Sequence, residues 1–183
     1  WHQCLGGSAT ESIYDIILLS DGNYLIAGYS DSPISGDVSE TNNGGTDVWV
    51  MKLDPAGNVI WQKMYGGNDN DGGIDVSCLE LPNSDIIIGT NSASGISGTK
   101  TEANKGGEDY WILRIDSSGT VIWDKTIGGS GNDRLFHMAI DSNVNIYLTG
   151  DSDSDASGDK TENAYGLQDV WIVKLSPNGI VQW

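Results

Sequence analysis

The densest group of potential metal ligands in the sequence is the stretch DSDSDASGDKTE, from Asp151 to Glu162. Alternating carboxylates in a loop suit Ca²⁺, which takes about six to eight oxygen ligands at adaptable geometry. In such a calcium site Asp151, Asp153 and Asp155 would converge, with Asp159 or Glu162 completing the ligand shell. The segment is not an EF-hand, because no helical pattern flanks it. The alternative, which the composition favours, is a solvated turn-forming loop that holds no metal.

Residues suited to catalysis are few. The two His residues, His2 and His137, lie in no motif, and neither GxSxG nor HExxH nor a phosphate-cradling loop occurs. Carboxylates are so numerous that two neighbouring acids say nothing about acid–base chemistry. Of the two Cys residues, Cys78 takes a repeat position held elsewhere by Leu18 and Ile140. We therefore expect a buried free thiol there, no disulfide to Cys4, and no enzymatic activity.

A repeat of about 60 residues organises the chain. The Trp residues fall at Trp1, Trp49, Trp61, Trp111, Trp123, Trp171 and Trp183. After Trp1, the other six form three consecutive pairs, and the two Trp residues of each pair are 12 positions apart. The second pair follows the first after 62 residues, and the third follows the second after 60. A Gly-Gly pair, an acid four residues later and a Ser-Gly pair keep the same phase. We therefore divide the chain into repeats 1–60, 61–122 and 123–183.

Each repeat is expected to form four short strands, because alternating apolar runs are separated by turn residues. The first three strands are predicted at 12–19, 23–29 and 47–53 in the first repeat, at 74–81, 85–90 and 109–115 in the second, and at 135–141, 145–150 and 169–175 in the third. A tight turn with a Gly leads to the fourth strand. Four antiparallel strands per repeat, in tandem, predict an all-β fold built of β-propeller blades.

The repeat unit W-x-K-x-x-GG-S-x-x-D … GG-x-D-x-W-x-x-K-L-D-x-x-G-x-x-W covers the whole chain. It resembles the tandem repeats of large secreted and cell-surface proteins of the Bacteroidetes. Its segments GGSGNDR and NIYLTG are similar to the broader bacterial β-propeller repeat family. The resemblance implies a β-propeller, type IX secretion, an extracellular or cell-surface location, and a role in surface structure or adhesion without catalytic residues. The sequence departs in lacking a sorting domain and in having Ser or Thr for several loop acids of the second repeat.

Both ends of the sequence fall within a repeat. Residues 1–5 match a fourth strand alone, and Trp183 begins another. Three blades are fewer than the roughly four to eight of known rings. We therefore expect residues 1–183 to be part of one propeller domain, a partial ring from a longer chain. The less favoured alternative is a ring closed by two or more copies, in which Trp1 and Trp183 would compete for one strand.

The chain is strongly acidic, with 26 Asp and Glu against 9 Lys and Arg and a net charge of −17. In a propeller, the loops between second and third strands and those between repeats emerge on one face, which would hold 17 acids and four bases. This charge disfavours binding to nucleic acid or anionic membranes, and no apolar run is long enough for membrane insertion. The expected partners are a protein or glycan at the acidic loop face and the rest of the propeller.

Other repeated side chains have a structural interpretation. A carboxylate where a loop meets a strand can accept backbone N–H bonds, and a basic side chain on the strand can form ion pairs. The strict phase of the Trp residues favours packing over sugar stacking. The polar residues concerned are Asp47, Asp109 and Asp169 at the junctions and Lys52, Arg114 and Lys174 on the strands.

We therefore expect a non-enzymatic β-propeller segment of an exported bacterial surface protein, serving as a scaffold, adhesion or protein-interaction module. The alternative is a lectin-like propeller that binds glycans through the long acidic loops between second and third strands, because these loops differ most among the repeats. A propeller hydrolase or lyase is a further, less favoured alternative.

Overall fold

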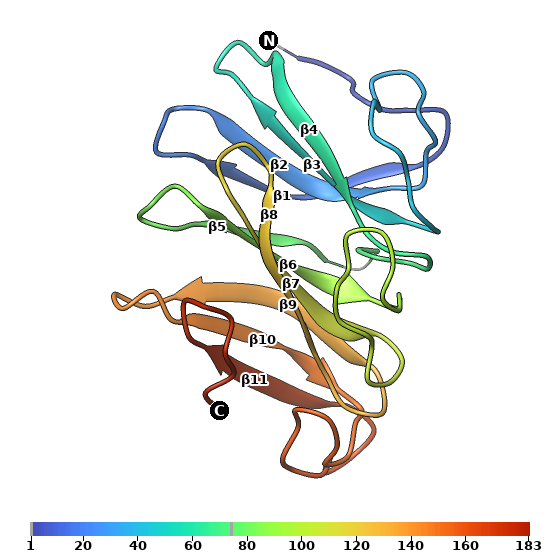
Figure 1. The fold of residues 1–183 in the computed structure, drawn as a ribbon, viewed down its shortest axis with the longest axis vertical. Coiled ribbons are helices and arrows are strands. Elements are labelled where there is room, and N and C mark those ends of the chain that lie inside the picture. The colour runs from blue at the N-terminus through green and yellow to red at the C-terminus, as the bar shows by residue number, and fades with distance from the viewer. Residues whose placement is uncertain (1, 74) are drawn as a thin grey trace.

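The computed structural model describes residues 2–73 and 75–183, which form three antiparallel β-sheets of four, four and three strands (Figure 1). Sheet 1 comprises β1 (Glu11–Leu18), β2 (Tyr24–Ser30), β3 (Asp47–Leu53) and β4 (Val59–Tyr65). Sheet 2 comprises β5 (Ser77–Glu80), β6 (Ile86–Ser92), β7 (Asp109–Ile115) and β8 (Val121–Ile127). Sheet 3 comprises β9 (Asp133–Ile140), β10 (Ile146–Ser152) and β11 (Asp169–Leu175). In these described ranges no helix capable of crossing a lipid bilayer is present.

Within each sheet the strands pair in chain order, so that each repeat forms its own meander. The all-β prediction is confirmed, and the third strands lie at the predicted residues 47–53, 109–115 and 169–175. The predicted strand 74–81 is shorter, since β5 begins at Ser77, and position 74 lies outside the described residues. The isolated fourth strand expected at residues 1–5 does not form over residues 2–5, while Trp1 lies outside the description.

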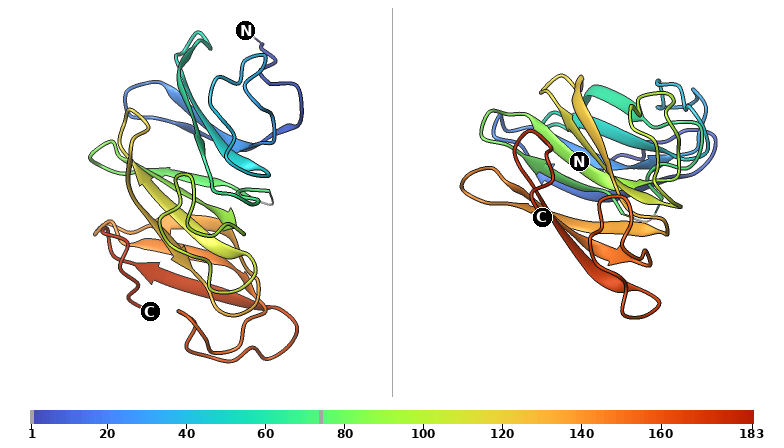
Figure 2. Two further views of the ribbon diagram at one scale, coloured as in Figure 1. Left: turned by 45° about the vertical axis from the view of Figure 1, so that its right-hand side comes forward. Right: turned by 60° about the horizontal axis from the view of Figure 1, so that its bottom comes forward.

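The sheets follow one another along the long axis of the molecule, with sheet 1 and sheet 3 at opposite ends (Figures 1 and 2). Sheet 2 is consequently buried on both faces. Trp111 and Leu113 face the core shared with sheet 1, whereas Tyr110 and Ile112 face the core shared with sheet 3. Each such large side chain contributes roughly 1.5–3 kcal/mol by leaving water. This double burial explains why β7 is apolar in succession rather than alternating.

The tight turns after the third strands use glycines in the left-handed region, as the sequence predicts. Gly57, Gly119 and Gly179 have φ values of 88°, 85° and 76°. Gly119 also lies against sheet 1, where the Tyr65 hydroxyl donates to its carbonyl oxygen at 2.6 Å. A side chain at this position would be strained by the positive φ and would crowd Lys63 and Trp61. The turn of one sheet therefore helps to fix the preceding sheet.

The turns between first and second strands provide a test of backbone strain. Gly22 in sheet 1 has a φ of 84°, while Ser84 takes the same turn position in sheet 2 with a φ of 66°. A left-handed non-Gly residue costs about 1–2 kcal/mol, partly offset by the greater freedom that Gly gains on unfolding. We expect Ser84→Gly to raise the free energy of unfolding in denaturant titrations by about 0.5–1 kcal/mol. The matched change Gly22→Ser should lower it; equal stabilities would contradict the assignment of strain.

Candidate functional site

The loops gather at one end of the sheets, on the right in Figure 1. The inter-repeat loops, residues 6–10, 66–76 and 128–132, enter the first strand of each sheet. The long loops, residues 31–46, 93–108 and 153–168, connect second and third strands. Hydrogen bonds join the two kinds of loop in every repeat, so the loops form one continuous surface. We take this loop end as the candidate site.

One carboxylate in each repeat holds an inter-repeat loop to a long loop. Asp71 Oδ2 accepts the Gly67 N–H at 2.6 Å and the Ser94 hydroxyl at 2.7 Å. Asp133 makes the equivalent bonds in sheet 3, at 2.6 and 3.0 Å. In sheet 1 the longer Glu11 takes this role. The acid four residues after each Gly-Gly pair is therefore an anchor for two loops.

A second carboxylate closes each long loop at its junction with the third strand. Asp47, Asp109 and Asp169 accept the N–H of the residue four positions earlier, at 2.7, 2.5 and 2.6 Å. This confirms the structural role predicted for these residues. Asp47 and Asp109 are fully buried, because the next sheet covers them, whereas Asp169 in sheet 3 remains partly exposed.

Four of the carboxylates at this end are interior rather than part of a solvated rim. Asp47, Asp71, Asp109 and Asp133 are each 0% exposed, and the Oδ1 atom of each lacks a hydrogen-bond partner among the described residues. Burial raises the pKa of Asp47 to about 6, and the nearby Asp71 carboxylate adds to the rise. The pKa of Asp109 is likewise raised to about 6, mainly by burial and further by Asp133. The loop anchors therefore carry a cost in charge burial.

The five predicted calcium ligands do not converge on one point in the structure. Asp153 accepts the backbone N–H and the side-chain amide of Asn132. Asp159 accepts the Gly128 N–H at 3.0 Å and forms an ion pair with Lys105. Two of the predicted ligands are thus engaged in holding the inter-repeat loop.

The other three predicted ligands do not complete a site. Asp155 is exposed and accepts the Ala164 N–H at 3.3 Å. Asp151 lies near Asp153 but also near Arg134, and Glu162 is exposed. The described residues contain no group of three or more His, Cys, Asp or Glu side chains placed to hold a metal ion. The calcium site stays a prediction that this geometry does not support.

Two buried lysines are absent from the sequence-based expectations. Lys100 is 1% exposed; its ammonium group contacts the Thr126 hydroxyl and lies 5.4 Å from the Trp111 ring centroid. Burial lowers the pKa of Lys100 to about 8. Lys160 donates to the Ser154 carbonyl oxygen at 2.7 Å. The sequence held a signal for this burial, because the equivalent repeat position in sheet 1 is an apolar residue, Val38, which is buried.

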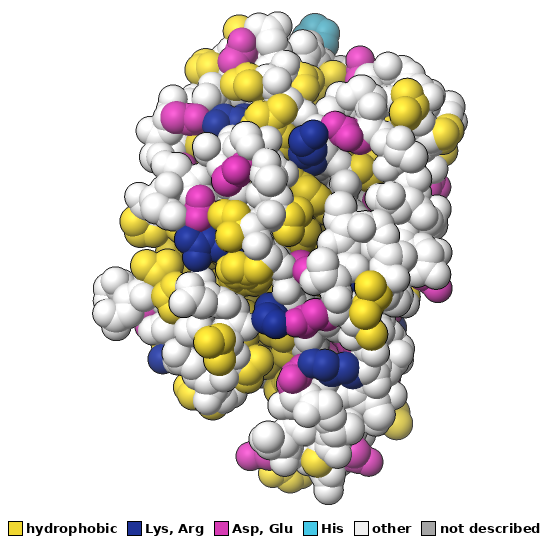
Figure 3. Space-filling view, viewed as in Figure 1, with side chains coloured by type: hydrophobic (Ala, Val, Ile, Leu, Met, Phe, Trp, Pro, Cys, Tyr) yellow, Lys and Arg dark blue, Asp and Glu magenta, His cyan; other side chains and the backbone are white. Residues whose placement is uncertain are grey.

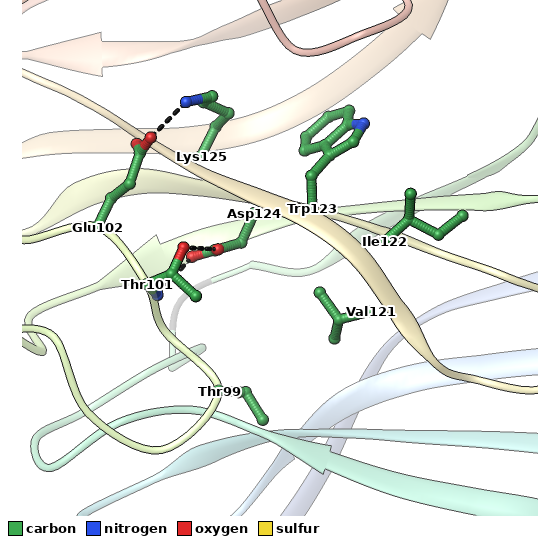
Figure 4. A pocket seen from close by; sticks show the side chains of 8 residues that line it. All are labelled: Thr99, Thr101, Glu102, Val121, Ile122, Trp123, Asp124 and Lys125. Carbon is green, nitrogen blue, oxygen red and sulfur yellow. Dashed lines mark hydrogen bonds and ion pairs between the residues drawn. The ribbon is translucent and has the colours of Figure 1, made fainter.

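A surface groove of about 510 Å³ lies beside β8 (Figure 4). Glu102 forms an ion pair with Lys125 across it, and the Thr101 hydroxyl donates to Asp124. Asp124 also accepts the Trp111 indole N–H at 2.9 Å. Its lining residues are Thr99, Thr101, Glu102, Val121, Ile122, Trp123, Asp124 and Lys125. The groove thus combines a paired charge with an apolar wall, which suits contact with a ligand.

The basic side chains of the third strands are mostly paired, as predicted. Lys52 and Arg114 form ion pairs with Asp21 and Asp85, each at 2.6 Å. Lys174 instead stacks over a Tyr ring, 5.3 Å from its centroid. In Figure 3, most of the basic side chains visible on this face likewise lie beside an acidic one. These cations therefore stabilise strand and turn contacts.

The packing role of the Trp residues is confirmed for most of them. Trp49 and Trp111 are buried, and Trp61, Trp123 and Trp171 pack against the core clusters. Trp183 is 61% exposed. Both Cys residues are free thiols, with Cys78 buried and Cys4 exposed, as expected. Burial raises the pKa of the Cys78 thiol, which keeps it protonated.

The buried Asp47 makes stability depend on pH. Its pKa is about 6 in the folded state against an ordinary value of 3.8, so the folded state holds the proton more tightly. Its contribution to the free energy of unfolding is therefore fully present below pH 3.8 and lost as pH rises through 6. Asp47→Asn should stabilise the protein by roughly 1–3 kcal/mol above pH 7, with the difference vanishing in acid.

Denaturant titrations from pH 4 to pH 8 check this prediction. Asp54→Asn is the matched control, because hydrogen bonds from the Asn58 side chain and backbone lower the pKa of this exposed turn residue. The control should be less stable than the wild type at neutral pH. A destabilised Asp47→Asn variant at pH 8 would contradict the account of the buried carboxylate.

No family model matches the sequence. The chain is 24% identical over 178 residues to the regulatory protein FlaEY of Caulobacter vibrioides. The matched region is 94% of this chain but only 18% of the length of that protein. A solved structure of a protein of unknown function from Bacteroides caccae resembles it with a TM-score of 0.40 at 14% identity, covering 98% of this chain and 68% of the other. These are similarities of a part to larger proteins.

Proposed function

We propose that residues 1–183 are three consecutive blades of one β-propeller domain, a partial ring, and that they act as a non-enzymatic scaffold or interaction module of an exported bacterial surface protein. Three meanders with the same strand order, packed face to face, support the blade interpretation. Since the resemblance to secreted repeat proteins motivates the cell-surface location and the type IX route, both remain part of this proposal.

Two kinds of residue at the loop end have different roles, and this difference is the main support for the proposal. Polar residues that recur in every repeat anchor loops, as Asp71 and Asp133 do. Side chains at the tips of the long loops are instead exposed and apolar, with Ile34 62% and Ile96 68% exposed. Exposed apolar side chains on a rigid loop framework are typical of contact surfaces. The framework thus presents the loop tips to a protein partner.

A glycan-binding role is the second candidate, and the groove beside β8 favours it. An aromatic wall at Trp123 with the neighbouring Glu102–Lys125 pair offers stacking and hydrogen bonding to a sugar. In this alternative the ligand contacts the groove rather than the loop tips.

Surface display tests the two candidates. We expect a non-adherent laboratory bacterium that displays the chain to attach to a panel of immobilised proteins, and the double change Ile34→Asn and Ile96→Asn to reduce attachment several-fold by removing apolar contacts. Ile16→Asn, at a 60% exposed position on β1, is the matched control and should have no effect.

Attachment to immobilised glycans that is lost with Ile122→Asn, at the groove, would favour the glycan-binding alternative. Attachment no greater than that of the carrier cells on every surface would contradict both candidates.

A further inference from the structure

The groove beside β8 lies at a place that sheet 1 fills with one of its own side chains. In sheet 1 the carboxamide of Gln62, on β4, bridges to the long loop, because its Nε2 donates to the Asp37 carbonyl oxygen at 2.8 Å. Its Oε1 accepts the Trp49 indole N–H at 2.9 Å and the Ser39 N–H at 3.3 Å. One carboxamide thus makes three contacts and joins the outer strand to the loop.

Asp124 takes the position of Gln62 in sheet 2 and reproduces two of the three contacts. Its Oδ2 accepts the Trp111 indole N–H at 2.9 Å and the Thr101 N–H at 3.0 Å. A carboxylate has no N–H to donate, and the Asp side chain is one methylene shorter than that of Gln. The loop carbonyl oxygen that would accept the third bond, on Thr99, consequently has no donor among the described residues.

The groove includes this position, since Thr99, Thr101 and Asp124 line it together (Figure 4). Its volume of about 510 Å³ is much larger than one carboxamide and lies within the range of roughly 300–1,000 Å³ that is usual for small-molecule sites. All its lining residues belong to sheet 2 and the long loop of the same repeat, and sheets pack on both faces of sheet 2. The groove is therefore complete within one repeat.

The other lining residues match the parts of an acetamido group on a sugar ring. Val121 and Ile122 form an apolar wall for a methyl group, and Ile122 is 50% exposed. The side chain of Lys125 is 36% exposed, and its ammonium group has three N–H donors, of which the ion pair with Glu102 needs one. Trp123 offers an aromatic surface to a ring. This last feature favours an amino sugar over the amide of a peptide.

We propose that this groove binds an N-acetylated amino sugar, whose acetamido N–H donates to the Thr99 carbonyl oxygen as Gln62 donates to that of Asp37 in sheet 1. The acetamido oxygen accepts an N–H of Lys125, and the methyl group packs on the apolar wall. The inference rests on the glycan-binding candidate, for which it names the class of sugar, and it is independent of contacts at the loop tips.

Two trisaccharides test the role of the acetamido group in the wild-type chain. Tri-N-acetylchitotriose and cellotriose have the same β-1,4-linked backbone, but cellotriose has hydroxyls in place of the acetamido groups. In saturation-transfer NMR we expect tri-N-acetylchitotriose to bind, with strong transfer to its acetamido methyl protons. Cellotriose should bind at least about fivefold more weakly, because it lacks the amide hydrogen bonds.

A substitution at position 124 tests the subsite itself. Asp124→Gln supplies from within the chain the carboxamide that sheet 1 has, so it should weaken binding of tri-N-acetylchitotriose at least about fivefold without lowering the melting temperature. Asp124→Asn is the matched control, because its amide is one methylene too short to reach the Thr99 carbonyl oxygen, and it should bind as the wild type does. The comparison of the two trisaccharides does not depend on either variant.

The outcomes separate this inference from the functions proposed above. Equal binding of both trisaccharides, lost in Ile122→Asn, overturns the inference and leaves the glycan-binding candidate standing. Binding of neither overturns the inference and that candidate, but not the loop-tip contact. Undiminished binding of tri-N-acetylchitotriose in Asp124→Gln also overturns the inference. Binding of a short glutamine peptide without binding of the sugar overturns it too, and assigns the groove to an amide of a protein chain.

Discussion

The hydrogen bond from the Gly67 N–H to the buried Asp71 carboxylate, repeated at Gly129 and Asp133, is the contact on which the arrangement of the sheets depends. It fixes the inter-repeat loop at the start of each sheet and, through Ser94 or Ser154, ties that loop to the long loop of the same repeat. A loop held at both ends delivers the next strand at a defined place, so that the following sheet can cover the preceding one. The Oδ1 atoms left without partners are the cost of placing these anchors inside.

Covering by the next sheet explains the differences among the repeats. The third strands are equally apolar in sequence, but β7 of sheet 2 is buried at six of its seven positions, whereas β11, with no sheet beyond it in the described chain, is buried only at Val173 and Leu175. The same contrast appears at the junction carboxylates, since Asp109 is fully buried and Asp169 is partly exposed. Each repeat therefore completes its packing only through a neighbour, as expected for tandem repeat proteins.

Local pattern predicted the strands well and the loop contacts poorly. The third strands were predictable to the residue because Trp49 and its counterparts lie within apolar runs that start at an Asp and stop four residues before a turn glycine. The calcium prediction at Asp151–Glu162 relied on spacing along one loop, but Asp153 and Asp159 bind groups of residues 128–132, more than 20 positions away. Lys100 was missed because a long basic side chain reads as exposed, although its aliphatic part replaces Val38.

The ionisation of the buried carboxylates tests most directly whether this loop end is built as an anchor rather than as a ligand site. The ¹³C carboxyl resonances of Asp47 and Asp109, followed by NMR from pH 3 to pH 9, should titrate near 6 in both residues and should not change when Ca²⁺ is added. Titration near the ordinary value of 3.8, or a Ca²⁺-dependent shift of either resonance, would contradict the account.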